Sequence, residues 1–199
     1  MTIMLHDVQY ILGLPVEGDA VVEQSGVASL KADFQNFLGI GADKLVAKPA
    51  SIWNNGRVSS QAIYERCLAE RGDVDIKVQG FLLLVLGSTI FVDKSGSRIP
   101  PSCILEVKKK DVQLCHYSWG SATLAYFYRQ LGVALQIGCK QIAGCLTLLQ
   151  SWIYEYFPAF RPVQGCLAIT STDARSARWD TRIQERDYHR VVSFRRRLE

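Results

Sequence analysis

The segment from Tyr117 to Leu131 constrains the fold more than any other part of this 199-residue chain. Two aromatic residues and two serines, in the run Tyr117-Ser118-Trp119-Gly120-Ser121, stand directly before an apolar stripe formed by Leu124, Phe127, Tyr128 and Leu131. Spacings of three and four residues place that stripe on one face of a helix. Ser118 is a candidate N-cap, because its hydroxyl can accept a hydrogen bond from an unpaired amide of the first turn. The segment predicts a buried, capped helix and indicates packing, not chemistry.

Similar spacing and capping signals recur along the chain. They predict helices over residues 6–12, 27–38, 59–69, from 74 onward, 100–110, 145–156 and 183–197, and the helices beginning near 118 and 145 are expected to pack antiparallel. Thr2 to Leu5 is predicted to be a short strand, and Val16 to Val22 a small hairpin around Gly18. The sequence therefore predicts one compact, mainly α-helical domain with a small N-terminal β element, a strand plus a hairpin.

The longest apolar run extends from Phe81 to Val92 and is interrupted by Gly87, Ser88 and Thr89. A bilayer-spanning helix needs about 20 predominantly apolar residues, so this run is too short to cross a membrane. We interpret it as part of one deeply buried helix and expect no membrane association.

The six cysteines stand at irregular separations, at positions 67, 103, 115, 139, 145 and 166, and include no C-x-x-C pair. A chain of this size can fold without covalent staples, so we expect reduced thiols. Cys115-His116 beside Cys103, or Cys139 with Cys145, leaves a zinc site open as an alternative, but structural zinc sites usually have two closely spaced ligand pairs. We therefore predict no metal and no cofactor.

The positive charge is concentrated at the C-terminal end. Residues 1–173 hold fifteen basic and fifteen acidic residues, whereas residues 174–199 hold eight arginines and four acids, which gives the net charge of +4. If residues 174–199 form an Arg-rich helix packed on or extending from the domain, one stripe on it consists of Arg175, Arg178, Arg182, Arg186 and Arg190. Such a stripe could bind the phosphates of a nucleic acid. The alternative is a solvated helix face that pairs with Glu185 and Asp187.

Three tryptophans are candidates for contacts with a protein partner, because aromatic residues concentrate in interface hot spots. They are Trp119, Trp152 and Trp179. Core packing is the alternative for all three, and for Trp119 and Trp152 it is favoured by their positions in or beside helical stripes.

Several separated motifs resemble one known family. They are Thr2-Ile3-x-Leu5-x-Asp7-Val8 leading to Leu12-Gly13-Leu14-Pro15-Val16-x-Gly18, then Tyr117-Ser118-Trp119-Gly120-Ser121-Ala122-x-Leu124-Ala125-x-x-Tyr128-Arg129, then Ile142-x-Gly144-Cys145-Leu146-x-Leu148-Leu149-Gln150-x-Trp152 and Tyr156-Phe157-Pro158. This pattern resembles the plant mobile domain, also labelled aminotransferase-like mobile domain, of the maintenance-of-meristems (MAIN) proteins. The resemblance covers nearly the whole of residues 1–199, which we interpret as a single domain that lacks a short upstream helix and strand.

The resemblance implies a nuclear protein concerned with transposon silencing, gene expression, meristem maintenance and genome stability, in a lineage also carried by transposable elements. It also implies a partner, a plant serine/threonine phosphatase of the metallophosphatase superfamily, with chromatin or nucleic acid as a further possibility. The aminotransferase label is not supported by the residues. A pyridoxal-phosphate enzyme needs a Schiff-base lysine, an acid facing the pyridine nitrogen and a phosphate site. None of these is recognisable here, and neither is a G-x-S-x-G elbow, so we predict no catalytic residues.

Overall fold

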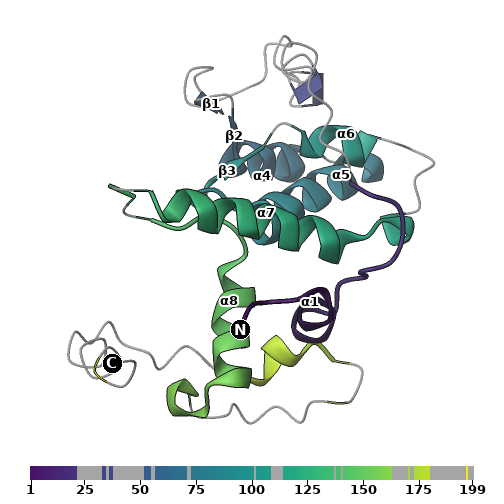
Figure 1. Ribbon diagram of the computed structural model, residues 1–199. Helices are drawn as coiled ribbons and strands as arrows, with labels where there is room; N and C mark the ends of the chain where they lie inside the picture. Colours follow the sequence, from purple (N-terminus) through teal and green to yellow (C-terminus); the bar gives the residue numbers. More distant parts are fainter. Residues whose placement is uncertain are drawn as a thin grey trace.

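The computed structural model contains two helical layers separated by one crossing helix (Figure 1). It describes residues 1–21, 33–34, 36–37, 52–54, 57–70, 73–100, 102–108, 114–136, 138–139, 141–162, 170, 173–179 and 196. The mainly helical class with a small β element is confirmed. The expected helix over residues 27–38 lies largely outside the described residues, as does most of that over 183–197, but Phe34 and Phe37 are helical and buried.

The N-terminal helix α1 (Leu5–Leu12) ends at Gly13, which adopts the left-handed conformation with φ of 69°. Residues 2–4 belong to no strand and Leu5 is already helical, so the predicted strand at Thr2 to Leu5 was wrong. The predicted hairpin at Val16 to Val22 is also not formed within residues 16–21. There Asp19 instead makes an isolated bridge with Tyr117, far away in sequence, and Val22 lies outside the described part.

The β element lies in the middle of the chain. It is an antiparallel sheet in the order β1 (Trp53–Asn54), β2 (Arg57–Ser59) and β3 (Arg98–Ile99). Asn54 pairs with Arg57, and Trp53 pairs with Val58. Val58 pairs with Ile99 and both side chains are buried, whereas Ser59 pairs with Arg98 on the opposite face. The sheet therefore has one core face and one polar face.

Two helices follow the sheet in the upper layer. Helix α4 (Ser60–Ala69) packs against α5 (Val74–Val85), which begins where the Asp73 carboxylate accepts hydrogen bonds from the amides of Asp75 and Ile76. A Cβ at Gly80 of α5 would lie 2.0 Å from Cys67 Sγ, so the two helices approach closely there. After Val85 the helix widens into a π-helical turn, Leu86–Ile90, followed by the loop that leads to β3.

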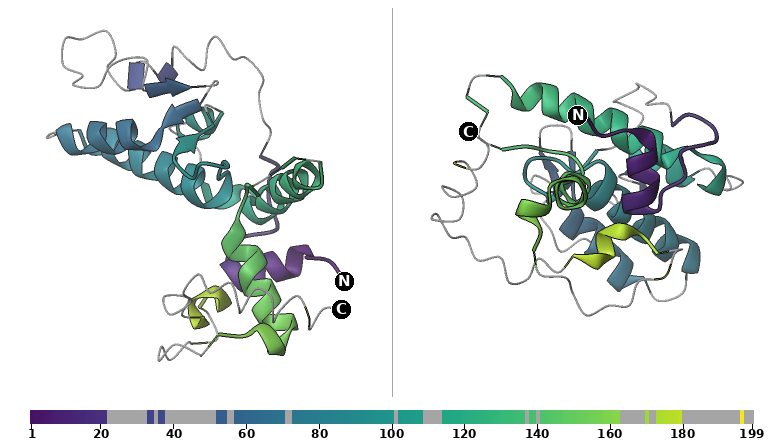
Figure 2. Two further views of the ribbon diagram at one scale, coloured as in Figure 1. Left: turned by 90° about the vertical axis from the view of Figure 1, so that its left-hand side faces the viewer. Right: turned by 60° about the horizontal axis from the view of Figure 1, so that its bottom comes forward.

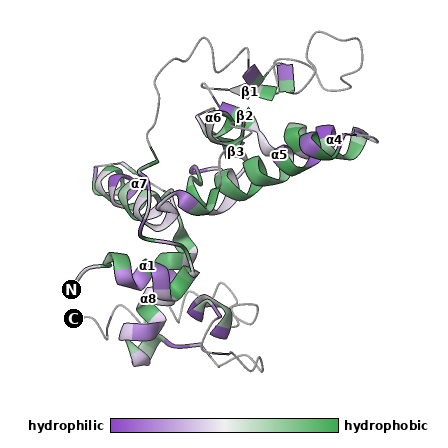
Figure 3. Ribbon diagram, turned by 90° about the vertical axis from the view of Figure 1, so that its right-hand side faces the viewer, coloured by the Kyte–Doolittle hydropathy of each residue, from purple (hydrophilic) through white to green (hydrophobic). Residues whose placement is uncertain are grey.

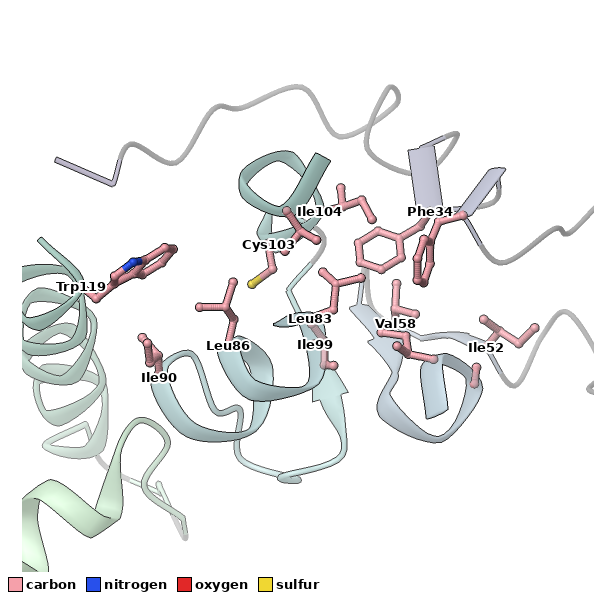
Figure 4. Close-up of a cluster of buried hydrophobic side chains, with 14 residues drawn as sticks. Phe34, Ile52, Val58, Leu83, Leu86, Ile90, Ile99, Cys103, Ile104 and Trp119 are labelled. Carbon is pink, nitrogen blue, oxygen red and sulfur yellow. The ribbon is translucent and has the colours of Figure 1, made fainter. Parts of the chain in front are cut away.

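The first core cluster joins this layer to α6 (Cys103–Lys108). Phe34, Ile52, Val58, Leu83 and Ile104 are among its most deeply buried side chains (Figure 4). Trp119 projects into the edge of this cluster from the next layer, toward Ile90 and Cys103.

Helix α7 (Trp119–Ala134) crosses between the two layers and follows a short 3-10 turn at Leu114–His116. Ser118 is its N-cap residue, but the Ser118 hydroxyl caps no amide. It donates to Val16 O at 2.7 Å and to Ser121 Oγ at 2.5 Å instead. The predicted capping bond was therefore wrong, because the hydroxyl ties the start of α7 to the N-terminal loop.

The second core cluster lies on the other side of α7. It contains Leu124 and Phe127 of α7, Val8 and Ile11 of α1, and Leu148 of α8 (Leu146–Tyr156). Helix α8 runs across the direction of α7 in both Figures 1 and 2, and α1 packs against both helices. The expected antiparallel pairing of α7 and α8 was wrong, because the two helices cross and α1 packs against both of them. Helix α8 is followed by a 3-10 turn at Pro158–Phe160.

Within the described residues, no helix is both long enough and apolar enough to span a bilayer. The five described cysteines are not joined in disulfides.

A buried carboxylate holds the N-terminal segment to α8. Asp7 is 4% exposed; its Oδ2 accepts from the Met4 amide at 2.8 Å, and its Oδ1 accepts from the Tyr156 hydroxyl at 2.5 Å. The hydrogen bond to Asp7 is the main reason that the pKa of Tyr156 is raised above its ordinary value of 10.0. The folded state thus holds this proton more tightly than the unfolded chain does, so the stabilisation is complete below pH 10 and is lost as the pH rises through the raised value.

We expect Tyr156→Phe to lower the free energy of unfolding by about 1 to 2 kcal/mol at neutral pH, because it leaves a buried carboxylate oxygen without its phenol donor. Urea unfolding at pH 7 and at pH 11 measures this. Tyr64→Phe removes a hydroxyl from an exposed position of α4 and should change the unfolding free energy by less than about 0.5 kcal/mol. An equal loss in both variants would mean that the Asp7 bond contributes nothing.

Candidate interaction surface

The three tryptophans proposed for partner contacts are each 8% exposed. Trp119 Nε1 donates to Leu114 O at 2.7 Å, and its ring lies 5.8 Å from that of Tyr117. The ring of Trp152 packs against those of Tyr156 and Phe157, with ring centroids 5.4 and 5.7 Å apart. The burial supports core packing, and the partner role of these residues stays a prediction.

Trp179 is the centre of a small aromatic and cationic cluster. Its ring lies 5.7 Å from that of Tyr154, and the guanidinium carbons of Arg161 and Arg178 lie 5.7 and 6.0 Å from its centroid. Arg161 also donates to Tyr154 O and Glu155 O, at 2.5 and 2.7 Å. Trp179 therefore anchors the end of its loop on α8.

The arginine stripe is placed only in part. Arg175 and Arg178 lie on a 3-10 turn, Arg175–Arg178, with Nη1 atoms 3.9 and 3.7 Å from the carboxylate of Glu155. The Arg175 guanidinium also lies 4.5 Å above the ring of Tyr10. Trp179 follows with extended backbone, so the segment is not one continuous helix from Arg175 onward. Arg182, Arg186 and Arg190 lie outside the described residues, and nucleic-acid binding by the stripe stays a prediction.

The most apolar exposed helix face belongs to α5, and its members share a spacing of four, three and four residues. We call it the α5 stripe; it consists of Val74, Val78, Phe81 and Val85, which are 69%, 51%, 65% and 36% exposed. This spacing places the four side chains within one narrow sector of the helix. Much of α5 is coloured hydrophobic in Figure 3. Tyr64 and Leu68, spaced by one helical turn on the neighbouring α4, are exposed as well.

This stripe corrects the interpretation of the run from Phe81 to Val92 as part of one deeply buried helix. Within α5, Gly80 and Leu83 face the core, while the opposite side reaches solvent. Both sides are apolar, so the run has no polar face from which exposure could be predicted. The sequence indicates solvent exposure only at the beginning of α5, where Asp73, Asp75 and Lys77 mark a solvated first turn.

An apolar hollow of about 580 Å³ lies at the C-terminal end of the α5 stripe. Val85 lines it from α5, Leu12 from α1, and Ile142 and Leu146 from the chain at the beginning of α8. Ile142 and Leu146 are 40% and 43% exposed at this place. The stripe and the hollow share Val85, so they form one continuous apolar surface.

Two of the hydroxyls of the apolar hollow are engaged in local structure, and Asp93, Lys94 and Ser95 also line it. The hydroxyls of Ser88 and Thr89 each donate to a backbone carbonyl one turn back, of Leu84 and Val85, at 2.5 Å. Burial raises the pKa of the Cys145 thiol, so it stays protonated at neutral pH and is a poor nucleophile. In the part of the chain that the structure describes, no three His, Cys, Asp or Glu side chains are grouped as metal ligands require. The hollow is suited to bind apolar groups.

Comparison with known proteins decides the family. The family model described as "Plant mobile domain" matches residues 1–199. The chain belongs to the plant mobile domain family. The MAINTENANCE OF MERISTEMS protein of Arabidopsis thaliana is 30% identical over 204 residues, which cover all of this chain and 40% of that protein. MAIN-LIKE 1 of the same plant is 32% identical over 81% of this chain and 32% of its own length. No solved structure matches.

A further relative in Arabidopsis thaliana has a name that refers to an enzyme. The protein named serine/threonine-protein phosphatase 7 long form homolog is 29% identical over 81% of this plant mobile domain chain, which is 12% of that protein's length. The chain thus spans less than half of each of these longer relatives, so the domain also occurs within longer chains.

Proposed function

We propose that this plant mobile domain is a non-enzymatic interaction module of the nucleus that acts in transposon silencing, gene-expression control and genome stability. In this proposal it acts by holding a protein partner, a serine/threonine phosphatase of the metallophosphatase superfamily. The observation that carries the proposal is the α5 stripe with its apolar hollow. A contiguous apolar surface of this kind is typical of a protein contact.

The geometry of the stripe supports contact with a helix or a groove. Side chains at positions i, i+4, i+7 and i+11 along α5 give a straight row that a partner can bury along its whole length. The apolar hollow at the end of the stripe can accept one apolar side chain of the partner. Side chains that fill such pockets contribute much of the binding energy of an interface. The relative named as a phosphatase supports the choice of partner, because in that protein a domain of this family lies in a chain whose name refers to a phosphatase.

The non-enzymatic part of the proposal is supported by the chemistry of the hollow. An activated nucleophile needs a lowered pKa or an adjacent base, whereas the Cys145 thiol has a raised pKa and the Ser88 and Thr89 hydroxyls donate to carbonyls. These residues provide apolar contact area instead.

Isothermal titration calorimetry of the chain with a purified plant phosphatase of this superfamily tests the proposal. We expect Phe81→Glu to weaken binding by about 30-fold or more, since it removes a large apolar contact and places a charge in a desolvated interface. Leu135→Glu is the matched control, because Leu135 is a very exposed apolar residue outside the stripe, at the end of α7. It should change the affinity less than threefold.

Two results would contradict different parts of the proposal. If the unaltered chain does not bind the phosphatase, the assignment of the partner is wrong. If it binds and Phe81→Glu and Leu135→Glu have the same effect, the partner is right but the α5 stripe is not the contact. Circular dichroism of both variants shows whether the helices remain folded, which is expected because both positions are solvent-exposed.

A further inference from the structure

The polar face of the small sheet carries two arginines close together. Ser59 of β2 pairs with Arg98 of β3, and Arg57 stands two residues before Ser59, so both arginines lie on the face opposite Val58 and Ile99. They are diagonal neighbours across the strand pair, at a separation that long side chains can bridge. Like charges so placed repel unless a group of opposite charge lies between them.

A hollow of about 540 Å³ opens beside this face, which we call the arginine hollow. It is lined by three cationic side chains, Arg57, Lys94 and Arg98, and by the hydroxyl-bearing residues Ser95, Ser97 and Tyr126. Asp93 is the acidic residue in its described lining, and Asp93 Oδ1 already accepts from the amide and the hydroxyl of Ser95, at 3.0 and 2.8 Å. The Tyr126 hydroxyl donates to Val92 O at 3.3 Å, and Arg98 Nη1 donates to Ile52 O at 3.2 Å. The lining therefore has an excess of positive charge, although several of its donors are used within the protein.

Arg57 is the residue of this lining with a buried donor that has no hydrogen-bond partner among the described residues. Its guanidinium is next to the Tyr126 hydroxyl, where it opposes the effect of burial, which raises the pKa of Tyr126. Its Nη1 is buried and has no acceptor among the described residues, and Arg57 takes part in none of the described ion pairs. A buried donor without a partner is destabilising. An acceptor supplied by a ligand would remove that penalty.

We propose that the arginine hollow binds a phosphate monoester group, either free or carried on a phosphorylated side chain. A phosphate monoester carries close to two negative charges at neutral pH and three acceptor oxygens. Arginine presents a planar fork of donors that matches such an oxyanion, and Lys94 adds a point charge. Three cations around one hollow thus match the charge of this ligand better than that of a single carboxylate.

NMR titration of the uniformly ¹⁵N-labelled chain at constant ionic strength tests this assignment. The probes are inorganic phosphate, N-acetyl-phosphoserine amide and, as a blank, N-acetyl-serine amide. We expect shifts in the amides of residues 57–59 and 94–98 with both phosphates and none with the blank. A tighter affinity for the phosphoserine probe indicates a side-chain source, and equal affinities indicate free phosphate.

The variant Arg57→Gln should weaken phosphate binding about tenfold or more, since it removes a charged donor pair from the ligand. Lys77→Gln removes the same charge from an exposed position of α5 outside the hollow, and should change the affinity less than twofold. Arg57→Lys retains the charge but not the planar fork of donors, so its phosphate affinity should lie between those of Arg57→Gln and Lys77→Gln. It also replaces Arg57→Gln in the test if that variant does not fold.

Three outcomes would overturn the assignment. They are an absence of shifts around Arg57, an equal loss of affinity in Arg57→Gln and Lys77→Gln, and binding of a single-stranded oligonucleotide but of neither phosphate monoester. The inference does not depend on the α5 stripe. Phe81→Glu should leave phosphate affinity unchanged even where it abolishes binding of a partner.

Discussion

Replacement of Phe127 by alanine should lower the free energy of unfolding by about 3 to 5 kcal/mol, one of the two largest losses that we expect from a single substitution in this protein. Phe127 is fully buried in the second core cluster, where α1, α7 and α8 meet. A Cβ added to Gly144 would lie 2.9 Å from Phe127 Cδ2, so the ring packs directly on the backbone there. Gly144 has a φ of 96°, a conformation that other residues rarely adopt. We therefore expect this backbone to relax little into the space left by the ring.

Urea unfolding monitored by circular dichroism at 25 °C measures the effect. Leu135→Ala is the control at the C-cap of the same helix, since Leu135 is exposed and should contribute less than about 0.5 kcal/mol to the free energy of unfolding. The loss expected for Phe127→Ala is a large part of the unfolding free energy of an ordinary domain, so this variant could fail to fold. In that case Phe127→Leu replaces it, with an expected loss of about 1.5 kcal/mol in the free energy of unfolding. A loss below about 1 kcal/mol for Phe127→Ala would show that the ring is not part of a packed core.

Helices with one apolar face were predictable from the sequence because their spacing and their ends carry independent signals. Helix α1 ends at Gly13, as its position after the last apolar residue indicates. Helices α4 and α7 also begin within a residue or two of the predicted positions. The partners of these helices were not predictable. The packing of α1 against α7 and α8 depends on contacts between residues more than 100 positions apart in the sequence.

The strands and the candidate surface escaped prediction for a different reason. Strands of two or three residues are too short to show the alternation of apolar and polar residues that identifies a strand. Helix α5 is apolar on both sides, so its sequence predicts burial although Phe81 is largely exposed. The three tryptophans illustrate the converse. Their chemical character suits an interface, but the structure buries them.

Gly18 shows how a single backbone position can determine the placement of α7. Gly18→Ala should lower the free energy of unfolding by about 3 kcal/mol or more. Gly18 has a φ of 120°, and a Cβ at this position would lie 2.2 Å from His116 O. That oxygen belongs to the backbone and accepts a hydrogen bond from the Asp19 amide at 2.8 Å, while Asp19 O accepts from the Ser118 amide at 2.9 Å. A side chain at Gly18 would force these two segments apart at the residue before α7.

Gly96→Ala is the matched control, because it makes the same chemical change at another glycine with positive φ. Gly96 has a φ of 65°, and a Cβ there would meet no atom within 4 Å. Gly96→Ala should therefore lower the free energy of unfolding only by the conformational strain, about 1 kcal/mol. The difference between the two variants in urea unfolding therefore reports the contact with His116 together with the greater strain of a φ of 120° than of one of 65°. Equal losses would mean that the segment holding Asp19 yields to an added methyl group, and that the bridge between Asp19 and Tyr117 does not fix the start of α7.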